Sequence, residues 1–412
     1  MPARANISKV DAYKLYLFFT SVQAFAFSTV FTVNLVYQVQ QVGLNPLQLV
    51  LIGTALELTA FLMEIPTGVV ADVYSRRLSV ILGFLLMGSG FIVEGSLPIF
   101  EALLIAQAIM GLGFTFLSGA TSAWIVDEIG LERAGGAFLR GAQVEQISSF
   151  GGIFFSVALA SVSLQLAIVC GGILLLALAL FLALFMPETG FQRRAASERE
   201  TWRAFLATFR GGVALVRARR ILLLITLAAI IHGAFSEGFD RLWITHLLQN
   251  FSLPPLGQLD EILWFGIISA VSMPLTLAAT EGLRRRLDLA DDRKVALTLI
   301  VVYAALISSV LLFIFSGTFA MALFGLWLTG AARAIRNPLM EAWINQHTDS
   351  DVRATVLSIQ GQADALGQIA GGPAVGAVGL LTSVRLAISL SAVLLLPILP
   401  VIRRTAQAGS ET

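Results

Sequence analysis

Twelve long apolar stretches, separated by short polar or arginine-bearing segments, follow one another along this chain of 412 residues. A helix that crosses the hydrocarbon core of a bilayer needs about 20 mostly apolar residues. Lipid also requires the backbone polar groups to be paired within the chain, and the stretches are too long and too uniformly apolar for barrel strands. The sequence therefore predicts an all-α membrane protein with twelve transmembrane helices. The predicted spans are 13–39, 47–71, 78–96, 99–129, 135–160, 164–186, 221–248, 258–280, 294–315, 318–346, 353–381 and 384–402.

Composition excludes several classes of protein. Hydrophobic residues make up 57% of the chain and charged residues 13%, whereas soluble domains carry about 25% charged residues. The 27 basic and 26 acidic residues nearly balance, so we expect no nucleic-acid partner. The single cysteine, Cys170, excludes an intrachain disulfide and a thiolate metal cluster. Hydrolase, zinc and Walker motifs are absent from the sequence, so we expect no metal, no cofactor and no enzymatic activity.

The distribution of basic residues predicts the orientation in the membrane. All but four of the 27 basic residues lie at the termini or in the even-numbered loops between spans, and basic residues accumulate on the cytoplasmic side. We therefore expect a multi-pass protein of a bacterial inner membrane with both termini in the cytoplasm. The first span is longer than the apolar region of a signal peptide, and no small-residue cleavage site follows it, so we expect this span to be retained.

The longest polar segment separates two sets of six spans. We expect an N-terminal bundle over residues 1–186, a cytoplasmic linker over 187–220 and a C-terminal bundle over 221–412. Apolar residues recur at helical spacing in the linker, and arginines repeat every seventh residue, which predicts an amphipathic helix on the inner leaflet. A solvated linker with chance periodicity is the alternative.

An internal repeat relates the two bundles. Ala26-Phe27-Ser28 recurs as Ala234-Phe235-Ser236, and Pro46 and Pro66 recur at the same offset, as Pro254 and Pro274. Later matches share a second offset, and they relate Glu145 to Asp364 and Gly152 to Gly371. A consistent offset across several spans predicts two six-helix pseudo-repeats of the same orientation, as in many secondary transporters.

The loop after the second span carries a recognisable motif. Residues 68–77 read GVVADVYSRR, which resembles the G-x-x-x-D-x-x-G-R-R/K signature of the major facilitator superfamily, with Ser75 in place of a glycine. The resemblance implies the fold of that family and a cytoplasmic latch. In such a latch Asp72 caps the helix start at 351–354, and Arg76 or Arg77 pairs with Asp127 or Glu128. A carboxylate at a helix N-terminus is stabilised by the free amides there. The predicted latch residues are Gly68, Asp72, Arg76, Arg77 and Asp127.

Two further phrases resemble the drug and macrolide efflux branch of that family, at residues 64–68 and 236–241. The chain departs from the proton antiporters of the family at Gln107, where they carry an arginine, and at Gly151-Gly152, where they carry a longer glycine-proline motif. A glycine-rich pattern appears instead from Gly367 to Gly376. We interpret it first as packing, because small residues let helices approach closely.

Charged residues inside predicted spans are the candidate functional residues, since each costs about 2.5–3.5 kcal/mol to insert and needs a partner, water or a proton. Seven acids and three arginines are embedded, so at least four acids lack an arginine. We favour an ion pair between Glu237 and Arg241, which lie four residues apart on one face. The acids are Glu57, Glu64, Glu145, Glu237, Asp240, Glu341 and Asp364, and the arginines are Arg241, Arg333 and Arg336.

The first functional hypothesis is proton-coupled efflux of a hydrophobic or cationic small molecule by an antiporter of the multidrug type, in which two halves rock around a central cavity. The alternatives are transport of an anionic metabolite or lipid-like acid clamped by two arginines, and a non-transporting membrane sensor. We expect a monomer in the lipid bilayer whose partners are the solute and protons. The predicted proton-coupling residues are Asp240, Glu237, Glu145 and Asp364. The predicted cavity residues are Glu57, Arg241, Arg333, Arg336, Phe235, Phe239 and Trp243, with Phe25 and Phe31 as further aromatic lining.

Overall fold

The computed structural model describes most of the chain, and every regular element in its described ranges is helical. The predicted all-α fold class is confirmed. Arg4 and Lys9 lie outside the described residues, as does most of the predicted amphipathic helix of the linker. The described part of that linker helix, from residue 210 to residue 218 with two gaps, is helical. The described residues are 11–191, 210–211, 213–214, 216–256, 260–287, 291–348 and 350–409.

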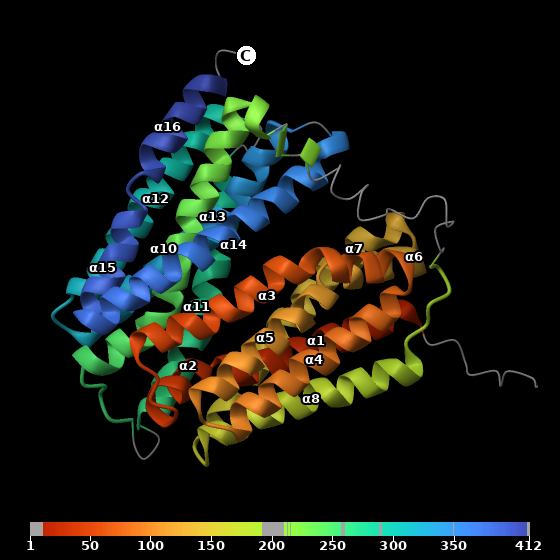
Figure 1. Cartoon of the computed structure of the whole chain (residues 1–412), viewed down its shortest axis with the longest axis horizontal. Helices are drawn as coiled ribbons and strands as arrows, with labels where there is room; N and C mark the ends of the chain where they lie inside the picture. Colours follow the sequence, from red (N-terminus) through yellow and green to blue (C-terminus); the bar gives the residue numbers. More distant parts are fainter. Residues whose placement is uncertain are drawn as a thin grey trace, which may run out of the picture. The chain divides into compact units, whose positions relative to one another are not determined.

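The helices form two units (Figure 1). Unit 1 comprises Met1–Gly43 and Leu58–Arg199, and unit 2 comprises Leu44–Glu57 and Glu200–Thr412. The first part of one helix, α3 (Pro46–Val73), therefore packs in unit 2, and its remainder packs in unit 1. The expectation of two halves that are contiguous in sequence does not include this exchange.

Each unit is built from the helices that its apolar stretches predict. Unit 1 contains α1 (Ala12–Phe31), α2 (Asn34–Val36), a π-helical stretch (Tyr37–Gln41), the remainder of α3, α4 (Arg76–Ser96), α5 (Phe100–Leu117), α6 (Ala120–Ile129), α7 (Leu131–Ala160) and α8 (Leu164–Phe185). Unit 2 contains the first part of α3, α10 (Arg220–Asn250), α11 (Asp260–Arg286), α12 (Asp292–Phe315), α13 (Phe319–Gln346), α14 (Ser350–Leu381), α15 (Val384–Leu394) and α16 (Ile398–Gly409).

Two predicted spans are broken, one at a glycine and the other near a proline. Between α5 and α6, Gly119 has a φ of 71°, a left-handed conformation that glycine adopts at little cost. Between α15 and α16, Pro397 lacks a backbone N–H group. Span 99–129 therefore consists of two consecutive helices, α5 and α6, and span 384–402 consists of α15 and α16.

Side chains cap the first turns of two helices, α4 and α12. Ser75 Oγ accepts a hydrogen bond from the Leu78 N–H at 2.9 Å, which caps α4. Asp291 accepts from the Lys294 N–H at 3.1 Å, which caps α12, and this backbone hydrogen bond, with the Lys294 side chain, lowers the pKa of the Asp291 carboxyl. Polar residues in the short loops thus define where the neighbouring helices begin.

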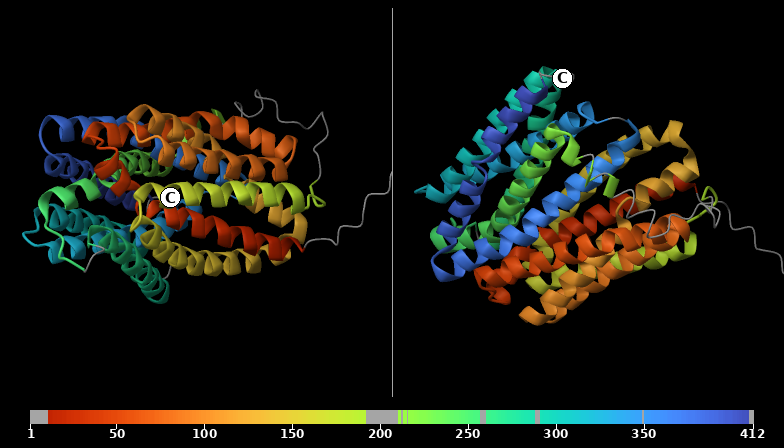
Figure 2. Two further views of the ribbon diagram at one scale, coloured as in Figure 1. Left: turned by 90° about the horizontal axis from the view of Figure 1, so that it is seen from below. Right: turned by 45° about the horizontal axis from the view of Figure 1, so that its top comes forward.

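Packing inside the units repeats in the way the sequence offsets predict. In unit 1, α1 packs along α7, and α4 lies side by side with α5 and α8 (Figures 1 and 2). In unit 2, α10 packs along α14, and α12 packs along α13. The pairs α1 with α7 and α10 with α14 come from repeat-related segments. Each unit buries large aromatic side chains, such as Phe19, Phe84 and Trp124 in unit 1 and Phe235 and Phe313 in unit 2.

The glycine-rich pattern of α14 serves helix packing, as its first interpretation holds. A side-chain carbon at Gly367 or Gly371 would overlap α10 at Ile230 or Ala234. A side-chain carbon at Gly376 would instead press on the first part of α3, and one at Gly372 would meet both α3 at Val50 and α10 at Glu237. The stripe thus lets α14 approach two helices of unit 2 closely on adjacent faces.

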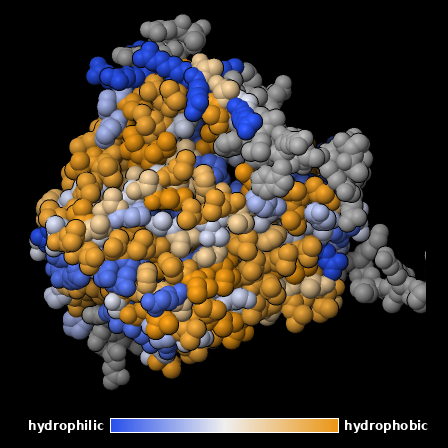
Figure 3. All heavy atoms as spheres, viewed as in Figure 1, coloured by the Kyte–Doolittle hydropathy of each residue, from blue (hydrophilic) through white to orange (hydrophobic). Residues whose placement is uncertain are grey.

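Nine helical segments in the described ranges are long and apolar enough to cross a membrane. The three other predicted spans, α7, α13 and α14, are long enough but more polar, because they carry several charged side chains each. Apolar residues cover most of the face shown in Figure 3, and many large apolar side chains in the described chain are exposed. The outer faces of the helices therefore fit a lipid environment, and the chain is a multi-pass membrane protein.

Candidate functional site

Unit 2 contains a cavity of about 500 Å³ between α10, α13 and α14. Pockets that bind small molecules are typically about 300–1,000 Å³. Each helix contributes residues three, four or seven apart, which is the spacing of one helical face. The lining residues are Ala229, His232, Ser236 and Asp240 from α10; Arg333, Arg336, Asn337, Met340, Glu341 and Ile344 from α13; and Leu357, Gln360, Gly361, Asp364 and Gln368 from α14.

The relative directions of α10, α13 and α14 show which lining residues lie at the same level of the cavity. Most of the charged residues lie toward one end, and most of the apolar residues lie toward the other. Helix α13 is antiparallel to α10, because Arg333 pairs with Asp240 while Arg219, just before α10, donates to a carbonyl just after α13 at 3.3 Å. Helix α14 is parallel to α10, since Gln360 Nε2 donates to Thr226 Oγ1 at 2.7 Å and later residues meet farther along. Charges therefore gather at the Asp240 end. The other end is lined by Ala229, Met340, Ile344 and Leu357, with Glu341 among them.

Asp240 and Arg333 form a two-pronged ion pair across the cavity wall. Arg333 Nη2 donates to Asp240 Oδ2 at 2.7 Å, and Arg333 Nη1 donates to Oδ1. The two side chains are 41% and 28% exposed, so the pair is open to the cavity rather than sealed in the core. Such bidentate pairs are the strongest arrangement of these two groups. The predicted two-arginine clamp is therefore changed, because the ion pair with Asp240 already engages Arg333.

Arg336 presents hydrogen-bond donors to the cavity. Its Nε donates to Tyr303 Oη at 2.9 Å, and its Nη1 donates to Asn337 Oδ1 at 3.1 Å. No carboxylate of the described chain lies within ion-pair distance of Arg336. A guanidinium carries five N–H donors, so several remain for a solute. Of the two predicted clamp residues, Arg336 is the one with donors to offer.

The predicted pair of Glu237 and Arg241 is formed, but away from the cavity lining. Arg241 Nε donates to Glu237 Oε1 at 3.1 Å, and the Glu237 side chain is 4% exposed. Gly53, on the first part of α3, covers the pair, and a side-chain carbon there would overlap both charged groups. Glu57 lies one turn farther along this helix and also lies outside the cavity lining. This arrangement has the character of a structural ion pair.

The aromatic residues of unit 2 that the sequence predicts at a cavity are not among the lining of this one. Phe235 and Phe239 are 0% and 3% exposed and stack on each other with ring centroids 5.7 Å apart. Phe239 also packs edge-on against Phe313, while Trp243 packs against Phe265. Burying these rings in the core of unit 2 removes more apolar surface from water than lining a polar cavity would.

Unit 1 has a smaller pocket of about 310 Å³ between α1 and α7. Glu145, the repeat counterpart of Asp364, lies in its wall beside Phe27 and Phe31, and no ion pair joins Glu145 to a basic residue in the described ranges. Phe31 is 58% exposed, whereas Phe25 packs against Phe155 and lies outside the lining. The two repeat-related acids thus each line the cavity of their own unit.

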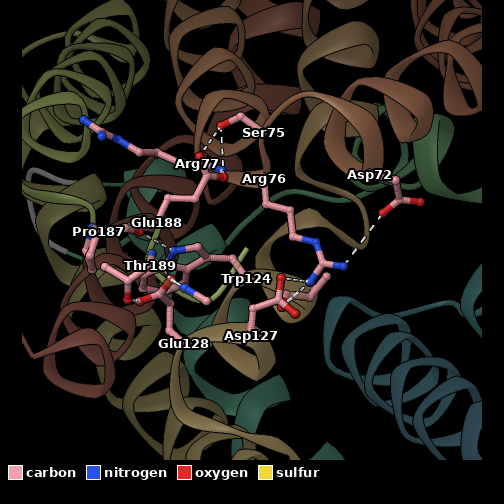
Figure 4. A network of polar contacts seen from close by, with 12 residues as sticks. Asp72, Ser75, Arg76, Arg77, Trp124, Asp127, Glu128, Pro187, Glu188 and Thr189 are labelled. Carbon is pink, nitrogen blue, oxygen red and sulfur yellow. Dashed lines mark hydrogen bonds and ion pairs between the residues drawn. The ribbon is translucent and has the colours of Figure 1, made fainter. Parts of the chain in front are cut away.

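The predicted latch residues of unit 1 form a network between α4 and α6 (Figure 4). Arg76 forms an ion pair with Asp127, and its Nη1 also donates to the Ala123 carbonyl at 2.7 Å. Asp72 lies 4.0 Å from Arg76 and is 58% exposed. The structure thus brings Arg76, rather than Arg77, to Asp127. The cap of Asp72 on residues 351–354 involves a different unit and stays a prediction.

Comparison with known proteins decides the family. Residues 17–290, more than half of the chain, match the Major Facilitator Superfamily. The chain belongs to the Major Facilitator Superfamily. The predicted family and fold are thereby confirmed, and the family is one of membrane transporters. The efflux branch of the superfamily stays a prediction.

Solved structures of the Major Facilitator Superfamily share the fold. The nucleoside transporter NupG has a TM-score of 0.77 at 15% sequence identity and covers 96% of this chain and 99% of its own. The peptide transporter POT in complex with sulfate has a TM-score of 0.71 at 12% identity, with 99% and 97% covered. The human organic anion transporter MFSD10 has a TM-score of 0.63 at 16% identity, with 95% and 98% covered. No curated protein sequence matches this chain.

The latch of this superfamily member includes Glu188, a carboxylate that sequence reasoning missed, and it gives Glu128 partners other than the predicted arginines. Glu188, after α8, accepts hydrogen bonds from Ser75 Oγ at 2.8 Å and from the Arg77 N–H at 2.9 Å (Figure 4). Glu128, at the end of α6, accepts from the N–H groups of Thr189 and Gly190 at 2.6 and 2.8 Å. The segment after α8 is therefore fastened to both α4 and α6. In the sequence, Glu128 and Glu188 each stand beside a helix end, where backbone amides are free to be bound by a carboxylate.

A buried carboxylate in unit 1, Glu94, was also missed. It is fully buried and accepts from Gln38 Nε2 at 2.7 Å and from Gln107 Nε2 at 3.3 Å. Tyr37 Oη donates to the Glu94 carbonyl at 2.6 Å. Gln107 is the position at which the antiporters of the superfamily carry an arginine, and here its amide serves the buried acid. An acid inside the predicted span 78–96 was the available signal.

Proposed function

We propose that this member of the superfamily is a proton-coupled secondary transporter that moves a small, polar, charged solute through the unit 2 cavity by alternating access. The observation that carries the proposal is the cavity of about 500 Å³ whose wall holds Asp240, Arg333, Arg336 and Asp364. A polar wall of this kind favours a charged solute over an apolar one, because an apolar solute would desolvate those groups without replacing their hydrogen bonds.

Arg336 is the proposed anchor for an oxyanion of the solute. Its planar guanidinium offers parallel N–H donors that match a carboxylate or phosphate, and Tyr303 and Asn337 fix its orientation. A solute that carried no oxyanion would leave these donors facing the cavity unpaired. This favours the anionic alternative among the predicted substrate classes.

Asp240 and Asp364 are the proposed coupling residues. A proton on Asp240 neutralises its side of the ion pair and frees Arg333 to face the solute, which links proton binding to solute binding in the same cavity. Asp364 lines the cavity and is not ion-paired to an arginine of the described chain. Glu237 is less suited to the role, because α3 covers its pair with Arg241.

A second candidate function is efflux of a hydrophobic cation. The observation that favours it is the unit 1 pocket, where the Glu145 carboxylate lies beside Phe27 and the exposed ring of Phe31. Aromatic faces and a carboxylate together attract organic cations. This function keeps the predicted antiporter mechanism, with Glu145 as the coupling acid.

Transport in proteoliposomes tests both functions. Vesicles holding the purified chain receive an imposed proton gradient of either sign, with a radiolabelled organic anion, a lipophilic cation or a neutral sugar. The first function predicts gradient-driven movement of the anion that is lost in Arg336→Gln and uncoupled from the gradient in Asp240→Asn. The second predicts movement of the cation that is lost in Glu145→Gln. Movement of neither, with correctly inserted protein, contradicts transport and favours the sensor alternative.

We further propose a monomer in the inner membrane with both termini in the cytoplasm. The support is the basic bias of the even-numbered loops. A tag at each end should be digested by protease only in inside-out vesicles. Digestion of one tag in each vesicle orientation would show that the termini lie on opposite sides.

A further inference from the structure

The unit 2 cavity holds charges of both signs, and three of the five form no ion pair with another described residue. Two arginines and three carboxylates line it, and one ion pair, between Asp240 and Arg333, joins two of them. The other three lining charges, Arg336, Asp364 and Glu341, form no ion pair with one another or with other described residues. A binding site that holds separate charges of opposite sign is suited to a solute with both charges.

On the basic side of the site, Arg336 is held in position by buried neighbours. Arg336 is held at Nε by Tyr303 Oη, 2.9 Å away, and Tyr303 is fully buried. His232, 4% exposed, lies beside it with its ring edge-on to the Tyr303 ring at 6.0 Å. His232 Nδ1 is buried and has no hydrogen-bond partner in the described chain. A guanidinium positioned in this way needs little rearrangement to bind a carboxylate, which favours affinity.

The acidic side lies on the neighbouring helix. Asp364 Oδ2 accepts from Gln368 Nε2 at 3.0 Å, and this hydrogen bond orients the carboxylate. Its Oδ1 takes part in no hydrogen bond within the described ranges. Gly233 lies against the Asp364 backbone, which places Asp364 at the level of His232 in the adjacent position of α10. Arg336 and Asp364 therefore line the same layer of the cavity, on α13 and α14, more than 4 Å apart.

We propose that this cavity binds a zwitterionic solute, with its carboxylate on Arg336 and its ammonium group on Asp364. This proposal rests on the proposed function and specifies its substrate class. The other end, where Met340, Ile344 and Leu357 lie beside Glu341, accommodates an aliphatic or aromatic side chain of the solute against its apolar residues. An anion alone would add negative charge to a cavity that already has more carboxylates than arginines. A cation alone would leave the donors of Arg336 unpaired.

Three compounds with one carbon skeleton test the proposal: phenylalanine, 3-phenylpropanoate, which lacks the ammonium group, and 2-phenylethylamine, which lacks the carboxylate. Leucine, 4-methylpentanoate and 3-methylbutylamine form a second set. Binding to the purified full-length chain is measured by calorimetry and by the shift in melting temperature. In at least one set, the zwitterion should bind roughly ten-fold or more tightly than the acid or the amine of that set. It makes one more charge-assisted hydrogen bond than either of them.

Variants assign each charge to its residue. Arg336→Gln should weaken the binding of phenylalanine and 3-phenylpropanoate but not that of 2-phenylethylamine. Asp364→Asn should weaken the binding of phenylalanine and 2-phenylethylamine but not that of 3-phenylpropanoate. Arg336→Lys and Asp364→Glu keep the charges and should retain part of the affinity, which separates lost contacts from lost folding. Glu281→Gln and Arg385→Gln remove one charge each from exposed sites of unit 2 and should change none of the affinities.

The outcomes separate this proposal from the proposed function. Equal binding of the acid and the zwitterion, with transport of the acid, overturns the zwitterion and leaves the proposed function standing. Preferential binding of the amine overturns the zwitterion and the role of Arg336 together. If no compound binds and the proteoliposomes move no solute, both proposals fail. Charge-specific losses in the two variants support the zwitterion.

Discussion

The two units place a buried carboxylate in opposite chemical settings. In unit 1, Glu94 is fully buried and accepts hydrogen bonds from the amides of Gln38 and Gln107. In unit 2, Glu237 is equally buried but pairs with the guanidinium of Arg241. The helix pairs α1 with α7 and α10 with α14 repeat, yet the charges do not. Repetition in this fold preserves how helices pack and leaves the polar chemistry free to diverge.

The cavities differ in the same direction. The pocket of unit 1 contains one charged residue, Glu145, beside aromatic rings, whereas the cavity of unit 2 contains five charged residues. At one repeat-related crossing, α10 and α14 approach more closely than α1 and α7 do. Gly367 lies against the backbone of Ile230, but its repeat counterpart in unit 1, Ser148, has room for a hydroxyl that bonds to Ser21. Unit 2 therefore has the more highly charged cavity and the closer packing at this crossing.

The largest expected effect distinguishes the two buried carboxylates. Glu237→Gln leaves Arg241 buried without an opposite charge, so the free energy of unfolding should fall by about 3–5 kcal/mol. Glu94→Gln keeps an acceptor for Gln38 and adds a donor for its Oε1 atom, which has no partner in the described chain, so the loss should be about 1 kcal/mol or less. Denaturant unfolding in detergent measures both. Equal losses would remove the contrast between the units.

A swap at the helix crossing should give the second largest effect. Gly367→Ser forces a side chain against the Ile230 carbonyl, and such overpacking costs about 1–3 kcal/mol. The reverse change in unit 1, Ser148→Gly, loses one hydrogen bond of 2.6 Å to Ser21, worth about 0.5–1.5 kcal/mol. Melting temperatures of the two variants compare them directly. A more stable Gly367→Ser variant would show that the close approach of α10 and α14 is not required.

A smaller difference in stability loss is expected between the latch of unit 1 and the corresponding loop of unit 2, where Glu281 pairs with Arg284 and Arg285. Asp127→Asn removes the partner of Arg76 from a site about three-quarters buried, and we expect a loss of about 1 kcal/mol. Glu281→Gln removes the partner of Arg284 and Arg285, which are 74% and 73% exposed, so the loss should be smaller than for Asp127→Asn. The same unfolding assay applies. A larger loss in Glu281→Gln would show that the second loop is the structural one.

The smallest effect on stability is expected for Asp72→Asn, within about 0.5 kcal/mol, because this carboxylate is exposed and 4.0 Å from Arg76. If Asp72 also caps the helix start at 351–354, the variant should change how often the cytoplasmic side opens. A cysteine at Asn337 in a Cys170→Ser background should then react faster with an impermeant maleimide in inside-out vesicles. Unchanged labelling with Asp72→Asn would contradict the latch role.

The predicted helices follow the apolar stretches closely, because lipid tolerates only paired backbone over some 20 residues. The breaks at Gly119 and Pro397 lie inside stretches of unbroken hydropathy, so hydropathy alone does not reveal them. The exchange of the first part of α3 into unit 2 was likewise not predictable. It depends on glycines of α14 and on Gly53, which fit against side chains more than one hundred positions away.

The candidate site was predicted as a set of residues rather than as a site. The sequence singled out Asp240, Arg333, Arg336 and Asp364 because charges are costly inside apolar spans. It paired Glu237 with Arg241, since four residues on a helix make them neighbours. It did not pair Asp240 with Arg333, because ninety-three residues separate them. It also placed Phe235 and Phe239 at the cavity, because a helical period does not reveal which face is inside.

The amino-acid sequence by itself determined that the chain is helical, crosses a membrane repeatedly and belongs to a duplicated fold, since hydropathy and spacing act locally along the backbone. The tertiary structure decided which charges cancel and which remain available. Arg333 is held by Asp240, whereas Arg336 and Asp364 line the same cavity without forming an ion pair. The reason is physical: an ion pair needs its two charged groups within about 4 Å of each other, and such distances between remote segments exist only after the helices have packed.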